Sequence, residues 1–193
     1  MSHDLAAGST RAGMGRCEPP QVLVLMGVSG SGKTTAGKRL SALLGWPFRD
    51  GDEFHPPANI EKMAHGIALD DTDRAPWLAA IAAWIDKCRS AGGGGIVSCS
   101  ALKRAYREII IGDRSDVRLV YLKGSRALIA DRMSRRRGHF MPPSLLASQF
   151  ETLEEPAADE HAIVVSIRLP PRRLAEQIAA LAGLTPSRLV GPV

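Results

Sequence analysis

The sequence predicts an α/β domain in which helices cover both faces of a five-stranded parallel sheet, so that the domain has three layers. Short apolar runs alternate along the chain with longer stretches whose apolar residues recur at helical spacing. A glycine-rich loop joins the first apolar run to the first helical stretch. The chain has 193 residues, of which 45% are hydrophobic, and this is enough to build one full core.

The first strand, loop and helix form the clearest unit. Residues 22–26 (VLVLM) are short, apolar and rich in Val and Leu, as expected of a strand buried on both faces. Residues 33–44 then carry apolar or small side chains at helical spacing. Gly45 supplies the residue that ends this helix.

Two further strand and helix units follow in the middle of the chain. The strongest helical pattern is at 74–91, because Trp77, Ile81 and Ile85 fall on one face and the glycine run 92–95 ends it. The other elements predicted here are a strand at 46–50, a short helix at 59–66, a strand at 96–100 and a helix at 101–111.

The last part of the chain continues the same alternation. It predicts a strand at 117–122, helices at 125–136 and 145–151, a strand at 162–165 and a closing helix at 171–182. We expect residues 1–20 to be a disordered extension, residues 21–184 to be the folded domain, and residues 185–193 to be a flexible tail.

Composition argues against nucleic acid and membrane partners. The net charge is +5, but much of the local excess lies in the arginine-rich run 132–137. Aromatic residues make up 5% of the chain, which leaves little with which to build a base-stacking surface. No apolar run approaches the length needed to cross a bilayer.

The cysteines and the N-terminal segment favour a cytoplasmic location. Cys17, Cys88 and Cys99 show neither metal-ligand nor disulfide spacing, so reduced thiols are expected. The first twenty residues are polar and glycine-rich, without the apolar core of a signal peptide.

Residues 27–34, GVSGSGKT, match the loop that cradles the phosphates of nucleoside triphosphates. Its glycines allow the backbone N–H groups to approach phosphate oxygens, and the following helix adds positive charge at its N-terminus. The lysine can reach the β- and γ-phosphates, and the Thr34 hydroxyl can ligate Mg²⁺. The predicted nucleotide-binding residues are Gly27, Val28, Ser29, Gly30, Ser31, Gly32, Lys33, Thr34 and Thr35.

An acidic turn, Asp50-Gly51-Asp52, ends the second predicted strand. In open parallel sheets, ligands bind beyond the carboxyl ends of the strands, so this turn is expected beside the phosphate loop. One of these two carboxylates, Asp50 or Asp52, can hold a water on Mg²⁺ while the other accepts the proton of a substrate hydroxyl. His55 follows in the same loop and either binds substrate or fixes the loop; the sequence favours neither interpretation.

Several cations are candidates for binding anionic groups. Arg74 follows an acidic run, and Lys103 and Arg107 are four residues apart on a predicted helix, where a solvated basic face is the alternative. Arg132 and Arg136 are also four apart, and together they suit a mobile lid that neutralises charge on a transferring phosphoryl group. A helix C-terminus complemented by basic residues is the structural alternative for these arginines.

The chain resembles the gluconokinases, a family of P-loop kinases that act on small molecules. The resemblance covers residues 22–182 in order. The matching segments are GVSGSGKT at 27–34, DGDEFHP at 50–56, NIEKM at 59–63, DRAPW at 73–77, CSALKRAYR at 99–107, YLKG at 121–124, GHF at 138–140, QFETLE at 149–154 and PAADE at 156–160.

This resemblance implies a three-layer P-loop kinase fold with a helical lid, like that of adenylate and shikimate kinases. It implies ATP-dependent phosphorylation of D-gluconate at the 6-hydroxyl, with ATP and Mg²⁺ as cofactors, and a cytoplasmic homodimer. Lys33, Asp52, Arg132 and Arg136 would then be catalytic, and Thr34 and Asp50 would serve the metal. The substrate-binding candidates are Asp52, His55, Arg74, Lys103, Arg107 and His139, with Arg74 and Arg107 as alternatives for the gluconate carboxylate.

Three other functions would share some of these sequence features. A related kinase acting on another small polyol acid, such as shikimate, would share the scaffold and differ in the loops after the second and third strands. A GTP-driven switch needs a guanine-selecting N-K-x-D motif after a strand, and 121–124 (YLKG) offers none. A nucleic-acid-binding regulator would show salt-dependent binding without ATP turnover.

Overall fold

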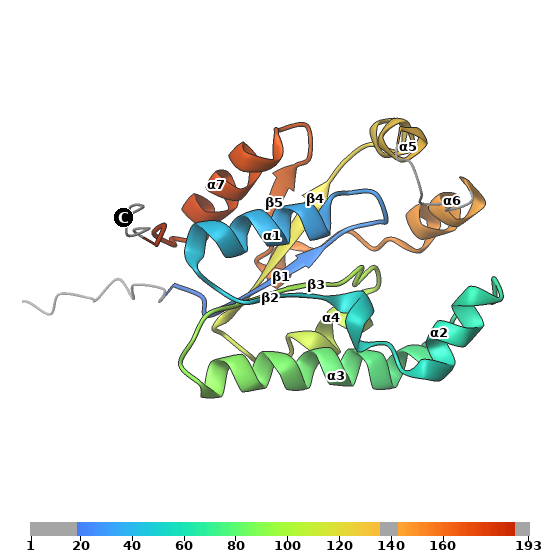
Figure 1. Ribbon diagram of the computed structural model, residues 1–193, viewed down its shortest axis with the longest axis horizontal. Coiled ribbons are helices and arrows are strands. Elements are labelled where there is room, and N and C mark those ends of the chain that lie inside the picture. The colour runs from blue at the N-terminus through green and yellow to red at the C-terminus, as the bar shows by residue number, and fades with distance from the viewer. Residues whose placement is uncertain (1–18, 136–142, 188–193) are drawn as a thin grey trace, which may run out of the picture.

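The computed structural model describes residues 19–135 and 143–187, which form a three-layer α/β domain (Figure 1). Its sheet has five parallel strands in the order β2-β3-β1-β4-β5. The strands are β1 (Val22–Met26), β2 (Phe48–Asp50), β3 (Gly95–Ser98), β4 (Val117–Lys123) and β5 (Ile163–Ser166).

Helices cover both faces of this sheet (Figure 1). Helices α1 (Lys33–Leu44) and α7 (Pro171–Leu181) lie on one face, and α3 (Asp71–Ser90) and α4 (Arg104–Ile110) lie on the other. Near the carboxyl ends of the strands are α2 (Pro57–Ala64), α5 (Arg126–Ser134) and α6 (Pro143–Thr152), and the short 3₁₀ turn η1 (Gly51–Phe54) directly follows β2. A second 3₁₀ turn, η2 (Ala158–Glu160), precedes β5.

The central strand β1 supplies side chains to two separate cores. Successive side chains of a strand point to opposite faces, so Leu23 and Leu25 pack with the α1 and α7 layer. Val22, Val24 and Met26 pack with the α3 and α4 layer instead. All five side chains are completely buried, which accounts for the continuous apolar run in the sequence.

The predicted strands and helices are all present among the described residues, and the differences lie at their ends. Helix α3 begins at Asp71 rather than 74, because the Asp70 side chain caps it by accepting the Asp73 N–H at 2.8 Å. Helix α4 begins at Arg104 rather than 101, because Ala101 has a left-handed φ of 44° that a helix cannot include.

The C-terminal end of the described chain contacts helix α1. Ser187 falls in the predicted flexible tail 185–193, yet it donates its N–H to the Leu43 carbonyl at the end of α1, at 3.0 Å. No helix among residues 19–135 and 143–187 has both the length and the apolar character of a membrane-spanning segment.

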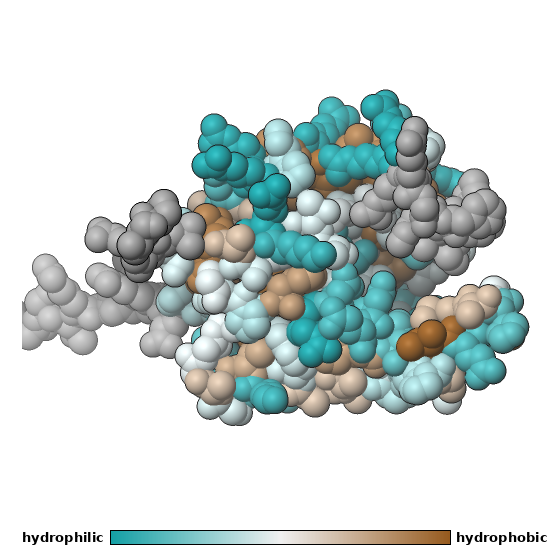
Figure 2. Space-filling view, in the orientation of Figure 1, coloured by the Kyte–Doolittle hydropathy of each residue, from teal (hydrophilic) through white to brown (hydrophobic). Residues whose placement is uncertain are grey.

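The surface seen in Figure 2 is largely hydrophilic, with a compact apolar area over α2. Ile60, Met63 and the following Ile67 are each about half exposed there. The short helix α2 therefore stands out from the body with part of its apolar side in solvent (Figure 1).

Candidate active site

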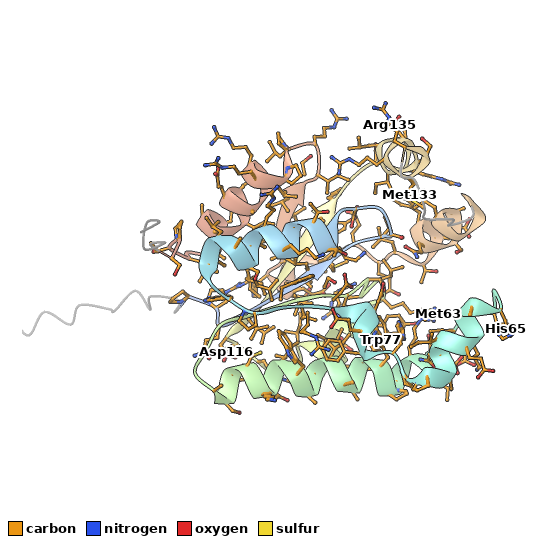
Figure 3. All side chains as sticks on the ribbon, in the orientation of Figure 1. Met63, His65, Trp77, Asp116, Met133 and Arg135 are labelled. Carbon is orange, nitrogen blue, oxygen red and sulfur yellow. The ribbon has the colours of Figure 1, made fainter. Side chains whose placement is uncertain are left out.

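The phosphate loop lies between β1 and α1 and is shaped by a tight turn. The Ser31 N–H donates to the Val28 carbonyl at 3.2 Å, which closes the turn. Gly30 has a φ of 78°, and a Cβ there would lie 2.7 Å from Cγ of Met133, which Figure 3 labels on α5. The turn therefore needs glycine both for its backbone conformation and for its contact with α5.

The phosphate loop ends at the N-terminus of α1, which has no capping side chain. Gly32 occupies the N-cap position with a left-handed φ of 94°, and no side chain caps the first turn of the helix. The lysine of the motif, Lys33, extends back over the loop and donates from Nζ to the carbonyls of Gly27 at 2.9 Å and Val28 at 3.2 Å. Positive charge is thus gathered where an anion would bind.

Asp50 connects the phosphate loop to the acidic turn. Its Oδ2 accepts the Thr34 hydroxyl at 2.7 Å, and its Oδ1 accepts the Ser98 hydroxyl at 2.9 Å. Burial alone would raise the pKa of this carboxyl, but the hydrogen bonds from Thr34 and Ser98 and the nearby Lys33 charge outweigh it. The net effect lowers the pKa of Asp50, so it is a carboxylate at neutral pH.

The same pair of oxygens suits a magnesium ion. The Thr34 hydroxyl and an Asp50 carboxylate oxygen are hard donors that lie 2.7 Å apart at the mouth of the loop. Within the described residues, no three His, Cys, Asp or Glu side chains gather into a metal site. Proteins usually hold Mg²⁺ through one or two side chains together with water and substrate phosphates, and the Thr34 and Asp50 oxygens match that pattern.

Gly51 and Trp77 fix the acidic turn against the sheet. A Cβ at Gly51 would lie 2.1 Å from the Ser98 carbonyl oxygen, so the close approach excludes any other residue. The indole of Trp77, on the sheet-facing side of α3 (Figure 3), donates to the Gly51 carbonyl at 2.7 Å. This support leaves Asp52 exposed at the start of η1, where it can meet a substrate.

His55 lies flat on Trp77, with ring centroids 4.5 Å apart and an interplanar angle of 9°. Burial and the Arg74 charge lower the pKa of His55, although Asp52 acts in the opposite direction. The imidazole is therefore neutral at neutral pH. In the described part of the chain, its buried Nδ1 has no hydrogen-bond partner.

Arg74 and Lys103 meet at one carboxylate near the N-terminus of α3. Lys103 Nζ contacts both oxygens of Asp71, at 2.9 and 3.0 Å, and Arg74 Nη1 lies 3.6 Å from the same carboxylate. Tyr106 donates to Asp71 and accepts from Arg74 at 3.3 Å. Two cations thus share one anion, so the group carries a net positive charge and remains partly exposed.

Arg107, predicted to bind the substrate, has a buried guanidinium that is already paired within the protein. Its side chain is 2% exposed and pairs with Glu160 at 2.5 and 2.9 Å. It also donates to the carbonyls of Ala101, Leu102 and Glu154. Arg107 therefore joins α4 to the segment that follows α6, and Arg74 is left as the candidate for the carboxylate.

Arg132 lines a cavity of about 220 Å³ beside the phosphate loop. Its guanidinium donates to the Ile167 carbonyl at the end of β5. Arg136 and His139, the other predicted residues of this region, lie outside the described residues. The cavity is lined by Gly30, Ser31, Gly32, Thr35, Ala36, Arg132, Met133, Leu169, Pro171 and Leu174.

The structure adds residues that the sequence argument did not select. Ser98 holds Asp50, Trp77 holds the acidic turn, and Gln149 on α6 accepts the Ser29 N–H at 2.6 Å. The strand ending at Ser98 did indicate this edge of the sheet, but no sequence signal marked its hydroxyl. Trp77 and Gln149 lie within resembling segments that assign neither residue a role at the site, and the helical pattern predicts Trp77 only as part of an apolar helix face.

Comparisons with known proteins place the chain among small-molecule kinases. The family model described as shikimate kinase matches residues 29–178. A gluconokinase of Gluconobacter oxydans (strain 621H) is 50% identical over 159 residues, which cover 82% of this chain and 89% of that protein.

Two crystal structures show the same relationship. A sugar kinase from Janibacter sp. HTCC2649 has a TM-score of 0.79 at 44% identity, with 86% of this chain and 96% of that one covered. A gluconokinase from Sinorhizobium meliloti 1021 has a TM-score of 0.77 at 42% identity, with 86% and 93% covered. On sequence and fold together, the chain belongs to the gluconokinase family of P-loop kinases.

Proposed function

We propose that the protein transfers the γ-phosphoryl group of ATP to the 6-hydroxyl of D-gluconate, giving 6-phospho-D-gluconate and ADP. Use of ATP follows from membership of a kinase family. The observation that carries the proposal is the 2.7 Å hydrogen bond between Thr34 and Asp50. This bond joins the loop that binds ATP, the phosphoryl donor, to the turn that meets gluconate, the phosphoryl acceptor. The relatives of the chain are gluconokinases.

The residues 27–35 bind the triphosphate in this proposal. Backbone N–H groups of the loop and the start of α1 face the phosphate oxygens. Lys33 exchanges its two loop carbonyls for the β- and γ-phosphate oxygens when ATP arrives. The cavity lined by Thr35, Arg132 and Pro171 lies next to the loop, and we assign the adenosine part of ATP to it.

Thr34 and Asp50 hold the magnesium ion that accompanies ATP. A magnesium ion held by these two residues would offset the negative charge of the phosphates during transfer. The lowered pKa of Asp50 keeps its carboxylate charged at neutral pH, and Ser98 fixes the orientation of that carboxylate. Ser98 is thus a positioning residue for the metal site.

Asp52 acts as the general base on the acceptor side. The 6-hydroxyl oxygen forms a bond to the γ-phosphorus while the bond from that phosphorus to the β,γ-bridging oxygen breaks. The hydroxyl proton passes to the Asp52 carboxylate, which is exposed at the start of η1. Neutral His55, held flat by Trp77, can exchange hydrogen bonds with the sugar hydroxyls.

The acid group of gluconate binds to the Arg74 and Lys103 pair. Both cations share the single Asp71 carboxylate and remain partly exposed, so a second carboxylate can bind to them. The lid completes the active site, as the family resemblance implies. Arg132 and Arg136 are proposed to neutralise charge on the transferring phosphoryl group, and His139 is proposed to bind the substrate.

The proposal includes a compartment and an assembly. We propose a cytoplasmic homodimer, on the family resemblance. Burial raises the pKa of the Cys99 thiol to about 12, and neither Cys88 nor Cys99 forms a disulfide, which fits a reducing compartment.

A coupled assay of ADP release tests the activity. Purified protein with Mg-ATP is presented with gluconate, shikimate, glycerate and nucleoside monophosphates, one at a time. Turnover with gluconate alone supports the proposal. Turnover with shikimate instead, the substrate that the matching family model suggests, would keep the kinase mechanism and replace the acceptor.

A further inference from the structure

A hydrogen bond joins the phosphate loop to a distant helix. The Ser29 N–H, inside the loop, donates to Oε1 of Gln149 on α6 at 2.6 Å, across 120 residues of sequence. The distance is short for an N–H donor, and both groups are partly buried. Neither ATP binding nor the acceptor chemistry described above uses Gln149.

The geometry of the turn explains why Ser29 needs a partner. The turn from Val28 to Ser31 is closed by the Ser31 N–H and the Val28 carbonyl, so the Ser29 N–H plays no part in closing it. That carbonyl also accepts from Lys33 Nζ at 3.2 Å. The peptide group between Val28 and Ser29 is thus held by its oxygen on one side and, through Gln149, by its nitrogen on the other.

ATP binding would remove one of the hydrogen bonds that hold the peptide group between Val28 and Ser29. When Lys33 turns to the phosphates, the Val28 carbonyl keeps the Ser31 N–H and loses the ammonium. A rotated peptide would direct a carbonyl oxygen toward the bound anion and weaken binding. The bond from Gln149 does not involve Lys33, so it can hold the peptide in place throughout this exchange.

Gln149 is itself firmly placed. On the same helix, Leu146 is buried in the core and Phe150 packs against it. Beyond the helix, the Glu154 N–H donates to the Leu102 carbonyl at 2.9 Å, which ties the chain to the segment after β3. The carboxamide therefore reaches the loop from a fixed support rather than from a free surface helix.

We infer that Gln149 is a positioning residue for ATP, which keeps the phosphate loop in its anion-receiving conformation when Lys33 moves to the phosphates. Helix α5 contacts the same turn through Met133 at Gly30. Helices α5 and α6 thus both support the loop, one by packing and one by a hydrogen bond. The inference rests on the proposed function for its use of ATP, and it does not depend on the identity of the acceptor.

The test compares Gln149→Met, which keeps the side-chain length and removes the acceptor, with Thr152→Val as the control. Thr152 lies on the same helix, and its hydroxyl donates to the Ser148 carbonyl one turn earlier. We measure the Kd for Mg-ATP by calorimetry, kcat and KM for both substrates, and thermal melting.

For Gln149→Met we expect the Kd and KM for ATP to rise about 3- to 10-fold, the size of effect of one lost hydrogen bond. KM for gluconate and the melting temperature should stay close to those of Thr152→Val. An unchanged Kd would overturn the inference, and so would a lower one, because it would mean that Gln149 competes with ATP for the Ser29 N–H.

Gln149→Glu keeps an acceptor for Ser29 and adds a charge beside the phosphates, so it serves if the methionine variant does not fold. We expect it to melt like wild type, and we expect its Kd for ATP to exceed that of wild type at low salt and to approach it at high salt, where the added charge is screened. A Kd that stays as high at high salt as that of Gln149→Met would count against the inference, because the retained acceptor should then hold the loop. If wild type binds ATP but does not turn over gluconate, the proposed acceptor fails and this inference stands.

Discussion

Replacing Arg107 by methionine separates a structural role from a substrate-binding role. The guanidinium is 2% exposed and its partner Glu160 is 12% exposed, so the substitution leaves a largely buried carboxylate without its cation. It also removes the donors to three main-chain carbonyls. Breaking a buried ion pair from one side costs about 3–5 kcal/mol. A domain of this size loses about 2–4 °C of melting temperature per kcal/mol, so we expect a fall of roughly 6–20 °C.

The assay pairs thermal melting with gluconate kinetics on the fraction that remains folded. Because the Arg107 guanidinium is buried against Glu160, we expect KM for gluconate within about twofold of wild type, a change below ~0.5 kcal/mol. The double variant Arg107→Met with Glu160→Met should be less destabilised than the single one, since it leaves no buried charge unpaired. A single variant that melts like wild type and has a much raised KM for gluconate would refute this reasoning.

Three further perturbations test the remaining site. Arg74→Met should raise KM for gluconate about 10- to 100-fold, as loss of a charged hydrogen bond would, while KM for ATP stays within twofold; equal changes in both would contradict its role. Asp52→Asn should lower kcat about 10²- to 10⁴-fold without lowering the melting temperature, and unchanged kcat would remove it as the base. The pKa of Asp50 is lowered by folding, so its contribution to stability is present above its ordinary pKa of 3.8 and is lost as pH falls through the folded value. In melts from pH 6 to pH 3, Asp50→Asn should therefore show a shallower decline than wild type, and parallel curves would contradict this.

The sequence allowed prediction of features whose cause is local. The apolar run of β1 and the glycine spacing of the phosphate loop depend on neighbours in the chain, and both are found as predicted. The pairing of Thr34 with Asp50 also follows, because parallel strands bring their carboxyl ends to one edge of the sheet.

The errors and omissions concern contacts between distant segments. The spacing of Lys103 and Arg107 predicts a shared helix face, but in the structure Lys103 is the N-cap of α4 and Arg107 lies within the helix. The partner of Arg107 is Glu160, 53 residues away, and no spacing rule indicates such a pair. No spacing rule indicates the contact of Gln149 either, because its side-chain amide reaches the Ser29 N–H only once α6 is packed beside the phosphate loop.

The central position of β1 has a consequence for how the molecule opens. Its five residues are completely buried and it is paired on both sides, by β3 and β4, whereas β2 is a three-residue edge strand with partly exposed side chains. Main-chain amides of such a central strand exchange their hydrogens only through openings of high free energy. Those of a short edge strand exchange through local openings of lower free energy. The phosphate loop is therefore attached to the slowest-exchanging part of the sheet, and the acidic turn to a faster-exchanging part. Partial unfolding from the β2 edge would release Asp52 while the loop that receives ATP stays in place.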